Sequence, residues 1–173
     1  ELESLLAMLL FGDGCAAALV TADPTGLALT DFRAATIADS ADAITWGVGD
    51  QGFDMVLSGR VPAILQQALS GPAGADLLRG HSPDAYGVWA VHGGGRAILD
   101  AVEAGLGIGQ GALNWSREVL RTCGNMSSAT IMFVLQRIMA GIGTSVPAGV
   151  PGFGVAFGPG LAAESFRFRT VGG

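Results

Sequence analysis

The sequence of 173 residues contains no lysine, so all nine of its basic residues are arginine. Acidic residues number 15, which gives a formal net charge of −6 at pH 7. Proteins that bind nucleic acid need a basic surface for the phosphate backbone, and this charge balance argues against that class. We interpret the missing lysine as the mark of a GC-rich bacterial genome.

Cysteine is also scarce, with Cys15 and Cys123 as the two copies. Two cysteines are too few for a disulfide framework, and neither has the spacing of a metal motif. Cys15 lies in a run of alanine, leucine and valine, which is typical of an inert core thiol. We interpret Cys123 as structural as well, so neither residue is a good candidate for a catalytic nucleophile.

Charged residues make up 14% of the sequence, against about 25% in a typical soluble domain. Half of the residues are hydrophobic, yet no uninterrupted apolar run approaches the roughly 18 residues of a membrane-spanning helix. Glu1 and Glu3 stand where a signal peptide would carry basic residues. We therefore expect a cytoplasmic chain with much of its surface covered by another chain or domain.

The order of hydrophobic segments predicts an α/β fold with a mixed sheet, formed by residues 1–173 as one domain. Strands are expected at 15–22, 27–37, 53–57, 86–91, 154–157 and 164–170, the last as an edge or half-exposed strand. Helices are expected at 5–11, 61–69, 96–106, 117–122 and 127–139, with Ser116 as the N-cap of the fourth. Segment 39–52 is expected to be a loop or short helix, and 71–83 a connection.

Two polar residues stand inside dense local motifs. His92 ends the apolar part of Trp89-Ala-Val-His-Gly-Gly-Gly-Arg96, and Asn125 opens the small-residue run Gly124-Asn-Met-Ser-Ser-Ala129. Two such donors can stabilise one carbonyl oxygen, although a structural histidine and a helix-capping asparagine fit the same residues. The three glycines after His92 lack the lysine and the spacing of a phosphate loop.

Four segments together resemble the C-terminal half of the type III polyketide synthases, the chalcone synthase-like family with a thiolase fold. They are the two motifs above, Leu10-Phe-Gly-Asp-Gly-Cys-Ala-Ala-Ala18 and Phe157-Gly-Pro-Gly-Leu-Ala-Ala-Glu164, in the family's order. The resemblance implies a mixed β-sheet covered by helices and completed by an N-terminal half, absent from this chain, that carries the nucleophilic cysteine. It also implies acyl-CoA and malonyl-CoA as substrates, no metal or other cofactor, and a homodimer of the complete unit.

The chemistry implied by the resemblance is an acyl transfer in which malonyl-CoA loses CO2 and its enolate attacks an acyl group on the cysteine. His92 would pair with the thiolate, and His92 and Asn125 would donate hydrogen bonds to the malonyl thioester oxygen. Gly93 stands where the family usually has proline, which leaves the backbone beside His92 less restricted.

The resemblance extends to residues that would contact the substrates. Phe11 and Phe53 match the family's pair of phenylalanines between the CoA tunnel and the cavity, Ser127 and Pro159 match cavity-lining positions, and Ala97 matches a backbone contact to the CoA arm. The apolar candidates for the cavity wall are Ile44, Trp46, Met55 and Val56, which allow an aliphatic or an aromatic starter.

Two alternatives stay open. The chain can be a non-catalytic partner subunit of a complete synthase, although the presence of both His92 and Asn125 favours the enzyme. It can also be a condensing enzyme like ketoacyl synthase III of fatty-acid synthesis, which shares the Phe-Gly-Asp-Gly turn and the His/Asn pair. Met126 and the turn Gly158-Pro-Gly160 favour the polyketide branch instead.

Overall fold

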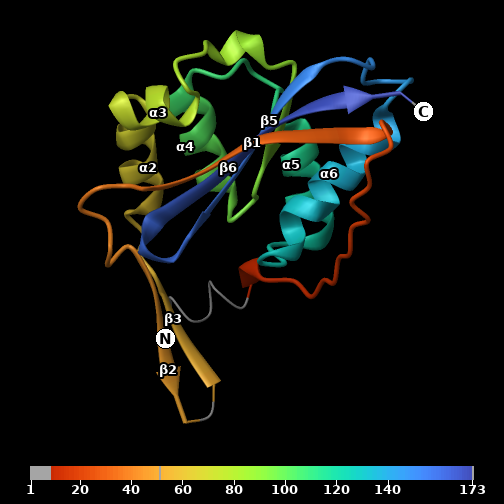
Figure 1. Cartoon of the computed structure of the whole chain (residues 1–173). Helices are drawn as coiled ribbons and strands as arrows, with labels where there is room; N and C mark the ends of the chain where they lie inside the picture. Colours follow the sequence, from red (N-terminus) through yellow and green to blue (C-terminus); the bar gives the residue numbers. More distant parts are fainter. Residues whose placement is uncertain (1–8, 51, 173) are drawn as a thin grey trace.

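The computed structural model describes residues 9–50 and 52–172, and a mixed four-stranded sheet lies at its centre (Figure 1). The strands follow the order β1-β6-β5-β4, and β6 is antiparallel to both of its neighbours, whereas β4 is parallel to β5. Their bounds are β1 Gly26–Thr36, β4 Val88–Val91, β5 Pro151–Gly158 and β6 Ala162–Val171. The predicted α/β class with a mixed sheet is confirmed.

Helices cover both faces of this sheet (Figure 1). Successive side chains of a strand point to opposite faces. Trp89 and Phe153 therefore pack on one helical layer, and Ala90 and Phe168 on the other. The first layer contains α2 (Val61–Leu69), α3 (Pro72–Leu77) and α4 (Arg96–Leu106); the second contains α5 (Asn114–Cys123) and α6 (Ala129–Gly141).

The helices at 61–69 and 96–106 have the predicted bounds. The predicted connection at 71–83 was wrong in part, because Pro72 begins the short helix α3 and Pro83 begins the 3-10 turn η1, Pro83–Ala85. The predicted helix at 5–11 lies mostly outside the described residues. None of the helices that the structure describes is long and apolar enough to cross a membrane.

A separate hairpin extends away from the sheet (Figure 1). It consists of β2, Ile44–Gly49, and β3, Gly52–Leu57, paired antiparallel. The predicted loop or short helix over 39–52 was therefore wrong in part: residues 39–43 form no strand, but β2 begins at Ile44. Threonine, tryptophan and valine favour a strand once a partner lies beside them. Trp46 is paired with Met55, so these two side chains share one face of the hairpin.

Residues 12–22 form no strand, and the predicted strand at 15–22 was wrong. The segment runs outside the sheet before β1 (Figure 1), with Leu19 89% exposed and Cys15 exposed as well. A strand needs a neighbour to satisfy its backbone hydrogen bonds, and no strand of the described chain lies beside this segment. For the same reason Cys15 is not the core thiol that the sequence predicted.

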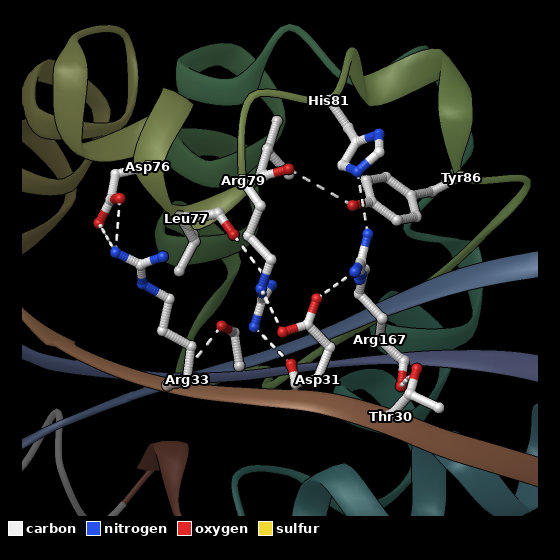
Figure 2. Close-up of polar contacts among 11 residues, drawn as sticks. Thr30, Asp31, Arg33, Asp76, Leu77, Arg79, His81, Tyr86 and Arg167 are labelled. Atoms are coloured by element: carbon white, nitrogen blue, oxygen red, sulfur yellow. Dashed lines mark hydrogen bonds and ion pairs between the residues drawn. The ribbon is translucent and has the colours of Figure 1, made fainter.

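An ionic cluster of charged and polar side chains contacts strand β1 after Thr30, where the register between β1 and β6 shifts (Figure 2). The Asp31 carboxylate is paired with Arg79, whose Nε lies 3.0 Å from Oδ1, and with Arg167 of β6. His81 Nε2 lies 2.9 Å from Arg167 Nη1. These contacts tie β1, β6 and the segment after α3 together, on the helical layer opposite α6.

The strand at 164–170 was predicted as an edge strand or a half-exposed strand. Strand β6 lies in the interior of the sheet, so the edge alternative was wrong. The alternation in Ser165–Arg169 has another cause. Arg167 points to the ionic cluster, while Phe166 and Phe168 pack against the second helical layer. The charge is therefore paired within the fold and does not mark an open sheet edge.

Candidate active site

A pocket of about 420 Å³ opens between the hairpin, helix α2 and the loops that follow β4 and α5. Its wall is mostly apolar, with Ile44, Trp46 and Met55 contributed by the hairpin. The predicted site residues that line it are Phe11, His92, Asn125, Ser127 and Pro159. The fold thus brings together residues that are separated by up to 148 positions in the sequence (Phe11 to Pro159).

His92 is the first residue after strand β4, and its backbone is held on both sides. Its N–H donates to the Val155 carbonyl at 2.9 Å, and its carbonyl accepts from the Gly94 N–H at 2.9 Å. Burial lowers the pKa of the His92 imidazole below its ordinary value of 6.5. The ring is therefore neutral at neutral pH, with one nitrogen as a donor and the other as an acceptor.

Asn125 follows helix α5, is 6% exposed and connects the two loops. Its Oδ1 accepts from the Ser127 N–H at 2.9 Å, and its Nδ2 donates to the Gly94 carbonyl at 3.3 Å. An amide nitrogen carries two hydrogens, and among the described residues only Gly94 accepts from it. The second N–H is available to a ligand in the pocket.

The segment before residues 12–22 pairs with the Asn125 loop as a short parallel bridge at Phe11. Asn125 donates its N–H to the Leu10 carbonyl at 2.9 Å, and Gly12 donates to the Asn125 carbonyl at 2.9 Å. A Cβ atom on Gly12 would lie 2.1 Å from the Cys123 carbonyl oxygen. Glycine is therefore required for the approach that places Phe11 at the pocket.

Ala97 is exposed in the first turn of α4, outside the residues that line the pocket, and its predicted backbone contact to the CoA arm stays a prediction. Phe53 is paired with Val48 in the hairpin; its side chain is outside the description, so its predicted role stays a prediction as well. Val56 is 51% exposed and is not in the wall, since it alternates with Met55 along β3.

Glu164 is the one acidic residue among the described residues of the wall, and the sequence did not predict it as a site residue. It is the last residue of the family-like segment that begins at Phe157, and the resemblance implies no role for it. Gly94 was missed as well, although its carbonyl joins the His92 and Asn125 loops. A glycine carbonyl leaves no signal in a sequence.

Comparison with known proteins places the chain in a family. The family of chalcone and stilbene synthases, C-terminal domain, matches residues 32–172. The chain therefore belongs to this family.

Solved structures of two polyketide synthases are similar in fold over part of their length. The chain is similar to PKS-I from the brown alga Ectocarpus siliculosus, with a TM-score of 0.75 and 30% identity over 89% of this chain. It is also similar to 1,3,6,8-tetrahydroxynaphthalene synthase from Streptomyces coelicolor A3(2), a bacterial type III polyketide synthase, with a TM-score of 0.76 and 32% identity over 86% of this chain. Each match covers 42% of the other protein, so the chain spans less than half of these relatives' length.

Proposed function

We propose that this chain is the C-terminal part of a type III polyketide synthase that condenses malonyl-CoA with an acyl-CoA starter. One observation supports this proposal above the others. His92 and Asn125 come from separate elements, line one apolar pocket and are joined through Gly94. Each retains a polar group that can face a ligand, as an oxyanion hole requires.

The proposed reaction begins with loss of CO2 from the malonyl group. The electrons of the broken C–C bond move into an enolate, whose negative charge lies on the thioester oxygen. The free Asn125 N–H and the His92 N–H donate to this oxygen, in a pocket whose apolar wall strengthens both hydrogen bonds. The enolate carbon then attacks the acyl thioester, a C–C bond forms and the cysteine thiolate leaves. The decarboxylation supplies the electrons, so the proposal assigns no metal or redox cofactor.

The nucleophilic cysteine is proposed to come from a segment outside these 173 residues. Cys123 is the last residue of α5 and packs against the core of the second helical layer, and neither it nor Cys15 is among the residues that line the pocket. The 42% coverage of the relatives leaves ample length for such a segment. The exposed apolar residues Leu19 and Val20 offer it a surface to cover. A homodimer of the complete unit and a cytoplasmic location remain predictions.

The composition of the native assembly tests this proposal. We expect the intact mass of the purified assembly to show this chain together with a segment that carries a reactive cysteine. Alanine at that cysteine should abolish condensation of malonyl-CoA with an acyl-CoA, measured by product mass spectrometry. A stable, monodisperse monomer of this chain alone would contradict the proposed division of the fold.

The pH dependence of stability offers a second test, in an assembly whose nucleophilic cysteine is alanine so that no thiolate faces His92. The folded state holds the His92 pKa below 6.5, and unfolding returns the ring to water. As the pH falls, the His92 ring of the unfolded chain takes up a proton at a higher pH than the ring of the folded chain. The free energy of unfolding should therefore decrease below about pH 6.5. His92→Gln should remove this part of the slope in urea titrations between pH 5 and 8, whereas His81→Gln should retain it. An identical slope for wild type and His92→Gln would show that the ring is not desolvated.

A further inference from the structure

Two fully buried hydroxyl groups hold the backbone beside the candidate catalytic residues. Ser116 of α5 and Thr130 of α6 are both 0% exposed. Ser116 Oγ accepts from the Val91 N–H at 3.0 Å, and Thr130 Oγ1 accepts from the Met126 N–H at 2.8 Å. Val91 is the residue before His92, and Met126 is the residue after Asn125.

The Ser116 hydroxyl supplies a hydrogen-bond acceptor for the backbone at the end of strand β4. This strand has one neighbour in the described sheet, β5, to which the His92 N–H is bonded. The Val91 N–H belongs to the other side of the strand, where the Ser116 hydroxyl is its partner. Ser116 was predicted as an N-cap, which was wrong: α5 begins at Asn114, and the hydroxyl is used across the fold.

The Thr130 contact fixes the loop between α5 and α6. Ser127, in the middle of this loop, has a φ of 55°, a conformation that is unfavourable for residues other than glycine. Two hydrogen bonds to side chains help to hold it there, one from Ser127 N–H to Asn125 Oδ1 and one from Met126 N–H to Thr130 Oγ1. Removal of the second leaves a buried N–H unpaired and allows the loop to relax.

We infer that Ser116 and Thr130 are positioning residues that fix the relative placement of His92 and Asn125 across the pocket. The inference rests on the proposed function, because the two donors must meet one oxygen. Each hydroxyl controls one of them, and neither hydroxyl lies in the pocket wall. A loss of placement weakens the hydrogen bonds to the developing charge more than it weakens substrate binding.

Matched threonine variants of the assembled protein test the inference. Thr130→Val removes the hydroxyl at constant shape, and Thr130→Ser restores it. Thr170 is the control, because it is 1% exposed and its Oγ1 accepts from the Val150 N–H at 2.9 Å, at the end of β5 away from the pocket. We expect Thr130→Val and Ser116→Ala to lower kcat for malonyl-CoA decarboxylation about 10- to 100-fold, with KM within about twofold of wild type. Thr130→Ser and Thr170→Val should stay close to wild type.

A second measurement separates this inference from the proposed function. In NMR titrations of the assembled protein, the ring signal that is lost in His92→Gln identifies His92. We expect Ser116→Ala and Thr130→Val to shift the titration of His92 toward its ordinary pKa, and Thr170→Val to leave it as in the wild type. If the wild type does not decarboxylate malonyl-CoA but this shift occurs, the proposed function fails and the positioning role stands. If Ser116→Ala and Thr130→Val match Thr170→Val in titration and kinetics, the positioning role is overturned. If Ser116→Ala does not fold, the comparison of Thr130→Val with Thr130→Ser decides.

Discussion

Alanine at His92 is expected to lower the rate of malonyl-CoA decarboxylation by the assembled protein by orders of magnitude. Loss of one preorganised donor to a developing oxyanion costs about 10²–10³-fold in rate, and His92 is also the proposed partner of the thiolate, so condensation should fall further. His92 forms its hydrogen bonds to Val155 and Gly94 through the backbone and not through the ring. Alanine retains both bonds, so the fold should survive the change. Release of CO2 from labelled malonyl-CoA measures the first step, and mass spectrometry of the product measures the second.

His81→Ala is the matched control for this variant. His81 is exposed beside Arg167 in the ionic cluster, and it is not among the residues of the pocket wall. We expect it to leave turnover within about twofold of wild type, as surface substitutions usually do. Near-normal decarboxylation by His92→Ala would refute the catalytic role and favour a non-catalytic partner subunit.

Alanine at Gly12 is expected to destabilise the assembled protein by about 3 kcal/mol, the upper end of overpacking effects. The added Cβ would lie 2.1 Å from the Cys123 carbonyl oxygen. This oxygen belongs to backbone at the end of α5, so neither group can rotate away. The Gly12–Asn125 hydrogen bond should break, and Phe11 should leave the pocket. Urea unfolding measures the stability, and malonyl-CoA turnover should fall with it.

Gly59→Ala controls for the loss of a glycine itself. A Cβ at Gly59 meets no atom within 4 Å, so alanine fits there without a clash. Its effect should be small or slightly stabilising, because alanine restricts the unfolded chain. Equal stability of the Gly12 and Gly59 variants would show that the bridge between Phe11 and Asn125 does not form in solution.

Helix bounds that are set by residues in or next to the helix were predicted correctly from the sequence. Helix α2 begins at Val61 with Pro62 in its first turn, and α4 ends where Gly107 adopts the left-handed conformation at φ 66°. Both bounds follow from residues inside or next to the helix. The two site motifs also follow from local residues, although their convergence on one pocket required the resemblance to a known family.

Several of the incorrect predictions share a physical cause, which is dependence on a distant partner. Strand β2 exists because β3 pairs with it, and residues 15–22 form no strand because no described strand lies beside them. The role of the Ser116 hydroxyl depends on a backbone N–H 25 positions away in the sequence. Periodicity and capping rules describe neighbours in the chain, so contacts of this kind lie beyond them.

The hairpin of β2 and β3 has a consequence for how such proteins diversify. It supplies Trp46 and Met55 to the pocket, whereas the residues proposed to act on the substrate lie on the loops after β4 and α5. Mutations in the hairpin can therefore change the size and shape of the wall without moving the hydrogen-bond donors. Substitutions at Trp46 and Met55 can therefore vary the hairpin's part of the wall while the two loops keep their sequence.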